Sequence, residues 1–287
     1  MTRAVRGALV IAAAALAVAV AVAALPSADA RTPAAKLRGV RTWAFAIGTT
    51  PTPARVPRLA RYDLVVVDGE EVTPGVVRDL HRRGTRVLAY LSVGTIEKGR
   101  SWSADLAPYR LDLWPEWDEW YADTSRPGFR DAITRRIAPR ILAKGVDGLF
   151  LDNVDMVESH PKQAAGMRTL VAALARLVHR RGGVLFAQNG EDTIGPLLRH
   201  LDGWNREDVT STHDGDYTRT SDADRSAAVA ALRRIRRAGL LVTATDYVAD
   251  GDAAGTADAV RTACAAGALP FVSDIDLTRI PKPIRCP

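Results

Sequence analysis

Gly145-Val146-Asp147-Gly148-Leu149-Phe150-Leu151-Asp152-Asn153-Val154-Asp155 joins a turn, an apolar run and a group of polar side chains. The apolar middle of this stretch shows no polar alternation, as expected of a strand that is covered on both faces in a parallel sheet. The run stops at Asp152, and Asp155 follows shortly after it. A second stretch, Leu64-Val65-Val66-Val67-Asp68, has the same form. Both stretches predict buried parallel strands that end in a carboxylate.

Short apolar or β-branched runs that end in a polar residue recur along the whole chain. They occupy residues 42–47, 64–68, 86–92, 147–152, 184–189, 203–207, 240–246 and 270–274. Between them lie stretches with apolar residues at helical spacing, such as residues 127–144 and 164–181. Strands that alternate with helices are joined by crossovers and therefore run parallel. Eight strand–helix units in a chain of this length predict a single-domain (β/α)8 TIM barrel.

An open, doubly wound α/β sheet is the alternative fold. That fold carries a glycine-rich phosphate-binding turn after its first strand. Here the first predicted strand is followed by Gly48-Thr49-Thr50-Pro51-Thr52-Pro53, which has no such pattern. A P-loop, a dinucleotide fingerprint and a Gly-x-Ser-x-Gly motif are also missing from the sequence. The barrel is therefore the favoured fold.

The N-terminal segment has the three parts of a secretory signal. Arg3 and Arg6 precede an uncharged apolar run over residues 7–25, and Ser27-Ala28-Asp29-Ala30 supplies a small-x-small cleavage pattern. We expect a signal peptide over residues 1–30 with cleavage near Ala30, a linker over residues 31–41 and the barrel over residues 42–287. The mature protein would be secreted, without stable membrane association. An uncleaved N-terminal anchor is the alternative, because the apolar run is long for a signal.

Composition excludes other classes of protein. With 47% hydrophobic residues the chain can bury a sizeable core, which excludes a disordered or fibrous protein. Lys and Arg number 39 against 33 Asp and Glu, giving a net charge of +6. The basic residues are spread as pairs such as Arg82-Arg83 and Arg180-Arg181 and are not massed with aromatic residues, so we expect no nucleic-acid partner. The two cysteines, Cys264 and Cys286, are expected to pair in an exported chain and to tie the C-terminus to the last helix.

Carboxylates stand at the ends of five predicted strands: Asp68, Asp152, Glu207, Asp246 and Asp274. In a (β/α)8 barrel the carboxyl ends of the strands surround the active site, so the expected mouth is acidic on a basic protein. A single Asp there would more often cap a helix or bind loop amides. Five carboxylates together raise one another's pKa, which favours acid–base chemistry on a sugar or binding of a cation. No histidine falls at a predicted strand end, so we expect no metal and no other cofactor.

Aromatic residues gather in the long connection after the third predicted strand. The group comprises Trp102, Tyr109, Trp114, Trp117, Trp120 and Tyr121. Long loops at a barrel mouth are often functional, and Trp faces stack on the C–H faces of sugars. The group is therefore either one wall of a saccharide cleft or a satellite hydrophobic cluster that holds the loop down, and both interpretations stay open.

Three motifs resemble glycoside hydrolase family 114, the endo-α-1,4-polygalactosaminidase family. They are Tyr90-Leu91-Ser92-Val93-Gly94 with Glu97 and Arg100, then Trp120-Tyr121-Ala122-Asp123, then the stretch from Gly145 to Asp155. The resemblance runs from about Trp43 to about Asp276, and the stretch from Asp147 to Asp155 is its most specific part. It implies a (β/α)8 barrel that cleaves galactosamine-containing polysaccharide without a metal.

The resemblance also implies roles for particular residues. The family's catalytic pair is an Asp after the fourth strand and a Glu after the sixth, which correspond here to Asp152 and Glu207, with Asp208 as an alternative to Glu207. We expect a retaining mechanism in which Asp152 is the nucleophile and Glu207 the acid/base. The residues expected to bind substrate are Asp68, Tyr90, Asn153, Asp155, Asn189, Asp246, Tyr247 and Asp274.

The expected partner is a cationic amino-sugar polymer, because a free amine suits an acidic cleft, and the expected state is a monomer. Two other functions stay open. One is a glycosidase that acts on another α-galactoside-like glycan, since barrel folds carry many specificities. The other is a carbohydrate-binding barrel without catalysis.

Overall fold

The computed structural model describes residues 35–287. By its internal contacts the chain divides into residues 1–31 and a second unit, residues 32–287, and only the second is described below. The predicted signal peptide and the start of the predicted linker lie outside the described residues. The rest of the predicted linker packs against the domain, since Leu37 and Val40 are buried in the same hydrophobic cluster as the first strand.

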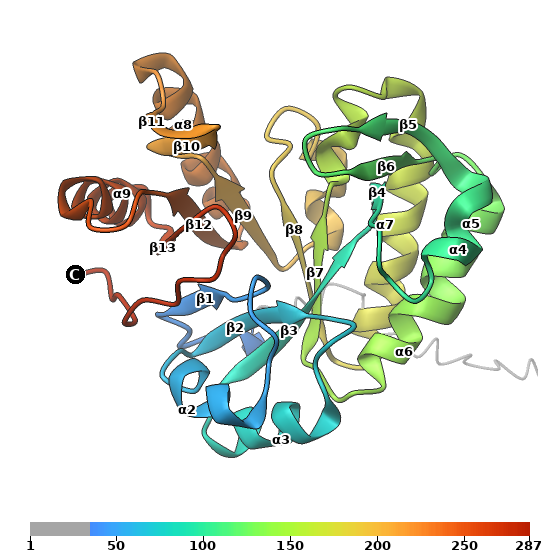
Figure 1. The fold of residues 1–287 in the computed structure, drawn as a ribbon, viewed down its shortest axis with the longest axis horizontal. Coiled ribbons are helices and arrows are strands. Elements are labelled where there is room, and N and C mark those ends of the chain that lie inside the picture. Colours follow the sequence, from blue (N-terminus) through green and yellow to red (C-terminus); the bar gives the residue numbers. More distant parts are fainter. Residues whose placement is uncertain (1–34) are drawn as a thin grey trace, which may run out of the picture. The chain divides into compact units, whose positions relative to one another are not determined.

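Eight parallel strands form the central sheet, in the order β1-β2-β3-β7-β8-β9-β12-β13 (Figure 1). Their bounds are Trp43–Phe45, Leu64–Asp68, Arg86–Ser92, Gly148–Asp152, Val184–Gln188, Gly203–Glu207, Leu241–Tyr247 and Leu269–Ser273. Each strand pairs in parallel with its neighbour in this order. Between the two outer strands, the indole Nε1 of Trp43 donates to the carbonyl of Leu269 at 2.8 Å. The sheet is thus a nearly closed barrel, which confirms the predicted fold class.

The helices that cover the sheet are α2 (Val56–Leu59), α3 (Pro74–Arg82), α7 (Ala164–His179), α8 (Asp222–Arg237) and α9 (Ala253–Ala266). Shorter segments are α4 (Ser103–Leu106), η1 (Pro53–Arg55), η2 (Ala107–Tyr109), η4 (Val154–Val157), η5 (Pro161–Gln163) and η6 (Gly195–His200). The helix predicted over residues 164–181 is confirmed as α7. The N-cap side chains of Thr73, Ser221 and Asp252 accept the first free backbone N–H groups of α3, α8 and α9.

The helix predicted over residues 127–144 consists of three parts. These are α5 (Pro127–Asp131), a π-helical turn η3 (Ala132–Ile137) and α6 (Ala138–Leu142). Pro139 lies at the start of α6, and because it has no N–H it cannot continue the preceding hydrogen-bond ladder, so the chain widens there. The predicted apolar stripe is unaffected, since its members are all buried: Phe129, Ile133, Ile137 and Ile141.

Two of the eight predicted strand–helix units lack an α-helix. The connection after β8 holds only the 3-10 helix η6, and no helix follows β13 in the described chain. After β13, the C-terminal tail, residues 274–287, packs where the eighth helix was expected. The hydroxyl of Tyr62 donates to the carbonyl of Pro281 at 2.6 Å, and Cys286 forms a disulfide with Cys264 in α9. The predicted bond between the C-terminus and the last helix is therefore confirmed.

Two small antiparallel sheets are inserted after barrel strands. The first consists of β4 (Thr95–Ile96), β5 (Arg110–Trp114) and β6 (Glu119–Ala122), and the second of β10 (Ser211–Asp214) and β11 (Asp216–Arg219). We call them the β5–β6 hairpin and the β10–β11 hairpin. Figure 1 shows them on either side of the end of the barrel toward which β3 and β7 point.

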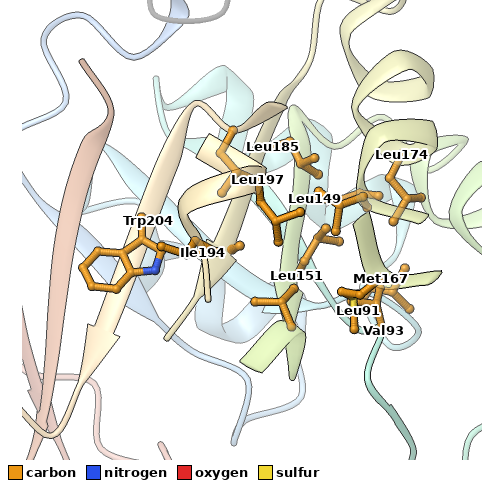
Figure 2. Close-up of a cluster of buried hydrophobic side chains, with 14 of the residues drawn as sticks. Leu91, Val93, Leu149, Leu151, Met167, Leu174, Leu185, Ile194, Leu197 and Trp204 are labelled. Atoms are coloured by element: carbon orange, nitrogen blue, oxygen red, sulfur yellow. The ribbon is translucent and has the colours of Figure 1, made fainter. Parts of the chain in front are cut away.

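Alternation along each strand separates two cores. Leu149 and Leu151 of β7 point outward into a cluster with α7, where Figure 2 shows them beside Met167 and Leu174. Phe150 points into the barrel, 4.9 Å from the ring of Phe45 and 6.3 Å from that of Phe186. Because side chains alternate with a period of two, Asp152 shares the inner face with Phe150. Truncating such a buried aromatic side chain costs about 3–5 kcal/mol.

The same alternation governs β9. Trp204 points outward into the cluster that contains α7 (Figure 2). Because side chains alternate along a strand, its neighbours at odd-numbered positions, Asn205 and Glu207, face inward. Gly203 starts the inner row because a Cβ there would lie 2.1 Å from the ring of Phe186. The inner faces of β7 and β9 therefore deliver Asp152 and Glu207 to one end of the barrel.

Candidate active site

A cavity of about 580 Å³ opens at the carboxyl end of the barrel strands. Eight of the ten residues singled out from the sequence line it: Asp68, Tyr90, Asp152, Asn153, Asp155, Asn189, Glu207 and Tyr247. The structure does not bring Asp246 and Asp274 into its lining. The cavity is thus formed by strand ends from around the barrel.

Three donors hold the Asp152 carboxylate. The hydroxyl of Tyr90 donates to Oδ2 at 2.7 Å, the backbone N–H of Asn153 to Oδ1 at 2.8 Å and the Gln188 amide to Oδ1 at 3.0 Å. Burial raises the pKa of Asp152, and these hydrogen bonds oppose the rise. The donors thus stabilise the ionised form of a buried carboxyl.

Asn153 supplies one of those donors from an unusual backbone conformation. Its φ is 58°, in the left-handed region that Asn tolerates better than most residues. Its side-chain amide donates to Ser92 Oγ at 3.0 Å and to Thr95 Oγ1 at 3.1 Å. These bonds fix the turn after β7 and hold the backbone N–H against Asp152.

A second buried carboxyl, Glu207, lies at the end of β9. Asn189 donates to its Oε2 at 2.9 Å and accepts the Glu207 backbone N–H at 3.0 Å, and the hydroxyl of Tyr247 donates to Oε1. Burial, and then the charge of Asp152, raise the pKa of Glu207 to about 8. Glu207 therefore keeps its proton at neutral pH while it faces a neighbouring carboxylate.

A buried amide network connects the strands that carry the two carboxyls. Asn205 donates to the Gln188 side-chain oxygen at 2.9 Å, and Thr243 Oγ1 donates to Asn205 Oδ1 at 2.9 Å. Since its oxygen accepts from Asn205, Gln188 turns its NH2 group toward Asp152. The network fixes which end of the Gln188 amide the cavity meets.

Asp68 lines the cavity with its charge already paired. Its Oδ1 accepts the backbone N–H groups of Glu70 and Glu71 at 2.8 and 2.9 Å, and its Oδ2 accepts from Arg100 at 2.5 Å. The Arg100 guanidinium also binds Glu97 through two nitrogens and lies 6.0 Å from the ring centre of Tyr90. Asp68 thus helps to hold Arg100 behind Tyr90.

Asp246 and Asp274 have internal roles instead. Asp246 Oδ1 accepts the backbone N–H groups of Thr210 and Ser211 at 2.6 and 3.0 Å, which fixes the chain entering β10. Asp246 alternates with Thr245 and Tyr247, whose side chains contact inner-face residues, so it points out of the barrel. Asp274 accepts from the backbone N–H and hydroxyl of Thr278 at 2.7 and 2.6 Å. Both are the loop-binding aspartates that the simpler interpretation of a strand-end Asp describes.

The cavity also contains acidic residues that the strand-end argument missed. They are Glu97, Glu116, Glu119, Asp214 and Asp276, and Asp208, the alternative to Glu207, lines the cavity as well. Glu119 lies on the inserted β6, where no strand-end signal exists; burial is the main cause that raises its pKa to about 7. Asp155 behaves similarly, since burial and the charge of Asp152 raise its pKa to about 7. The lining is therefore more acidic than the sequence indicated.

The aromatic group after β3 divides between the two interpretations given for it. Trp114 and Trp117 line the cavity. Trp102, Tyr109, Trp120 and Tyr121 instead pack against the hydrophobic cluster that contains α7. The connection is thus both a wall of the cavity and a satellite of the core.

Two features of residues 35–287 bear on other functions. In this part of the chain no three His, Cys, Asp or Glu side chains are grouped so as to hold a metal ion. Within the same residues, no helix has the length and apolar character needed to cross a membrane.

The fold and the site define a class of protein. Two buried carboxyls, one held by three hydrogen-bond donors and one whose pKa is raised to about 8, face a sugar-sized cavity at the carboxyl end of a (β/α)8 barrel, which is the arrangement of barrel glycosidases. The chain belongs to glycoside-hydrolase family GH114, whose sequence model matches residues 22–280. The family resemblance stated from the sequence is thereby confirmed, and the protein is a glycosidase.

Two solved structures share the fold of the chain, and one further protein is similar to it in sequence. The glycoside hydrolase domain of PelA from Pseudomonas aeruginosa matches with a TM-score of 0.74 and 24% identity, over 86% of this chain and 99% of that one. Ega3 of Aspergillus fumigatus, solved in complex with galactosamine, matches with a TM-score of 0.67 and 19% identity, over 86% and 95% of the two chains. An uncharacterized protein of Deinococcus radiodurans is 26% identical over 266 residues, covering 85% of this chain and 83% of its own.

Proposed function

We propose that the protein is a secreted, retaining glycoside hydrolase that cleaves α-linked galactosamine-containing polysaccharide, with Asp152 as nucleophile and Glu207 as acid/base. The observation that carries the proposal is the contrast between the two carboxyls. Three hydrogen-bond donors favour the carboxylate of Asp152, whereas burial, and then the charge of Asp152, raise the pKa of Glu207 to about 8. A retaining glycosidase needs this division of protonation states.

The chemistry then has two steps. The Asp152 carboxylate attacks the anomeric carbon while Glu207 transfers its proton to the departing glycosidic oxygen, which forms a glycosyl ester and breaks the inter-sugar bond. Glu207, now ionised, removes a proton from a water molecule, whose oxygen attacks the anomeric carbon and releases Asp152. Tyr90, Asn153 and Gln188 hold the carboxylate in place for the attack.

The charge of the cavity favours an amino sugar with a free amine. Eight acidic side chains besides the catalytic pair line it: Asp68, Glu97, Glu116, Glu119, Asp155, Asp208, Asp214 and Asp276. Arg100 is the only Lys or Arg in its lining within residues 35–287, and it is paired with Asp68 and Glu97. A sugar ammonium group gains from this field, whereas an anionic glycan is repelled. The galactosamine bound by the Ega3 structure has such an amine and supports the same substrate class.

The test compares catalytic variants with a neighbouring acidic control. Release of reducing ends from de-N-acetylated galactosamine polymer is measured for the wild type, Asp152→Asn, Glu207→Gln and Asp246→Asn. We expect a loss of at least a thousandfold in the first two variants and near-wild-type kcat in Asp246→Asn once folding is verified. If Asp208→Asn were inactive while Glu207→Gln turned over, Asp208 would be the acid/base instead.

The substrate and the stereochemistry are tested separately. Acetylated galactosamine polymer and neutral α-galactans serve as alternative substrates, and faster turnover of a neutral galactan would move the protein to another α-galactosidase specificity. Proton NMR of the first-formed products shows whether the α-anomer is released; initial β-anomer would mean inversion and would exclude Asp152 as nucleophile. Binding without any turnover would favour a carbohydrate-binding barrel.

Export is tested on the full chain produced in a secreting bacterial host. The protein recovered from the medium should begin near Arg31. Recovery in the membrane fraction with an intact N-terminus would support the anchored alternative.

A further inference from the structure

The cavity extends beyond the catalytic pair, between the two inserted hairpins. The β5–β6 hairpin contributes Trp114 at the end of β5 and Glu116 and Trp117 in the turn, and the β10–β11 hairpin contributes Thr212, His213 and Asp214. We call this part, together with Asp208, the outer cleft. Its walls belong to elements that are separate from the barrel strands (Figure 1).

Trp117 presents an indole ring to the outer cleft. It is 46% exposed, and in the described part of the chain only Leu113, at 37%, is a comparably exposed large hydrophobic residue. The ring of Trp117 meets that of Trp114 edge-on, with centroids 6.4 Å apart, and Trp114 stacks on Tyr121 at 5.4 Å with an 8° tilt. The exposed ring therefore lies on a supported platform, as a sugar-stacking residue requires.

Two carboxyls of the outer cleft lack the pairing found around Asp68. Asp208 Oδ1 is buried and has no hydrogen-bond partner, and the residue adopts a φ of 54°. Burial raises the pKa of Asp208 against the charge of Arg206 and a hydrogen bond from the Thr212 side chain, and the charge of Glu116 adds to the rise. Glu116 itself is exposed at the turn of the opposite hairpin. A buried carboxyl oxygen that has no hydrogen-bond partner and lies near a second carboxylate is suited to bind a cationic hydrogen-bond donor.

We propose that the outer cleft is a second sugar-binding subsite, in which Trp117 stacks on one unit of an amino-sugar chain while Asp208 and Glu116 bind its ammonium group. This inference rests on the proposed function and deepens it. A subsite outside the catalytic pair makes productive binding depend on chain length, and its position between two open hairpins lets the polymer continue past it. The subsite then discriminates between free and acetylated amines away from the reacting sugar.

The chain offers a matched control for each part of the subsite. Leu113 is on the same hairpin as Trp117 and is similarly exposed, but it does not line the cavity. Asp118 is close to Glu116 in sequence, is paired with Lys98 and also lies outside the lining. Its φ of 53° is compatible with Asn, so Asp118→Asn should fold normally.

Steady-state kinetics are measured on de-N-acetylated α-1,4-linked galactosamine hexamers and on their fully N-acetylated counterparts. Trp117→Ala should raise KM for the de-N-acetylated hexamer at least tenfold, and Leu113→Ala should change it less than twofold. Glu116→Gln should raise KM at least fivefold for the de-N-acetylated hexamer and less than twofold for the acetylated one, with Asp118→Asn neutral on both.

Three outcomes would overturn the inference. Equal KM values for Trp117→Ala and Leu113→Ala would mean that Trp117 does not stack on the substrate. Equal effects of Glu116→Gln on both hexamers would mean that Glu116 does not bind an ammonium group. Loss of kcat in Asp208→Asn at unchanged KM would place Asp208 in the chemistry rather than in the subsite. A wild-type protein that cleaves no galactosamine polymer would instead refute the proposed function, so the two failures are distinguishable.

Discussion

Tyr90 links the nucleophile to the charged cluster behind it. Its hydroxyl donates to Asp152, and the Arg100 guanidinium, held by Glu97 and Asp68, lies against its ring. A hydrogen bond to a charged group contributes about 1.5–3 kcal/mol. Because this hydrogen bond holds the nucleophile in position, we expect Tyr90→Phe to lower kcat by roughly 10- to 100-fold at optimal pH.

The same variant makes a separate prediction for pH dependence. The Tyr90 hydrogen bond lowers the pKa of Asp152, so its removal raises that pKa. The acidic limb of the kcat/KM profile should consequently move to higher pH in Tyr90→Phe. A profile that keeps its acidic limb while kcat falls would mean that Tyr90 acts on substrate and not on Asp152.

Glu207 should set the alkaline limit of activity. Catalysis requires its protonated form, which is lost as the pH rises through a pKa of about 8. The Tyr247 hydrogen bond lowers this pKa, so Tyr247→Phe should move the alkaline limb upward. The kcat/KM profile of both proteins checks this, and a limb that moved downward would contradict the assignment.

The buried acid also has a cost in stability. Glu207 has its pKa raised from an ordinary 4.5 to about 8 in the folded protein, so between these values the folded state binds the proton and the unfolded state does not. The free energy of unfolding therefore falls as the pH rises through that window. Glu207→Gln removes the effect, and we expect its Tm to exceed that of the wild type by more at pH 8 than at pH 4.

At the scale of elements, the β5–β6 hairpin is fastened to the segment after β7. His160 Nε2 forms a hydrogen bond with Asp112 Oδ1 on β5 at 2.8 Å, and its Nδ1 forms one with Ser159 Oγ at 2.8 Å. The centre of its ring lies 4.3 Å from that of Tyr121 on β6. This contact supports the stack that carries Trp114. The hairpin thus depends on a residue outside it for its position over the cavity.

Loss of this contact should loosen the cavity wall without unfolding the barrel. In His160→Ala we expect amide hydrogen exchange over residues 110–122 to become at least tenfold faster and KM for the polymer to rise severalfold. His200→Ala, on the unrelated η6, is the control. Unchanged exchange in the hairpin would show that its own sheet suffices to hold it.

At the scale of the whole molecule, the C-terminal tail closes the barrel where a helix would otherwise lie. It begins beside the cavity, where Ile275, Asp276 and Leu277 belong to the lining, and it ends at the disulfide between Cys264 and Cys286. Gly48 allows the close approach, because a Cβ there would lie 1.7 Å from the Asp276 carbonyl oxygen. One covalent bond therefore secures a segment that forms part of the active-site wall.

Removal of that bond should affect stability first and activity second. A disulfide that closes a loop with a sequence separation of 22 stabilises by about 3 kcal/mol in the chain-entropy model. The double variant Cys264→Ser/Cys286→Ser should lose about that much free energy of unfolding in urea titrations, and KM should rise because the tail lines the cavity. A loss of stability with unchanged KM would show that noncovalent contacts alone hold residues 275–277.

The amino-acid sequence by itself determined the barrel and the position of its two central carboxyls. Apolar runs fix the strands, and the period of two along β7 and β9 places Asp152 and Glu207 on the face shared with Phe150 and Asn205. The same period, applied to β12, would have turned Asp246 away from the cavity, since Thr245 and Tyr247 occupy the inner positions.

The tertiary structure alone decided which other carboxylates share the site. A strand end fixes the height of a residue in the barrel, but beyond the last strand residue the direction of a side chain depends on turns such as the left-handed Asn153 and Asp208. Glu119 and Glu116 arrive from a hairpin whose fold depends on packing against residues distant in sequence. Local patterns could not encode their place, because it results from contacts that exist only once the barrel has formed.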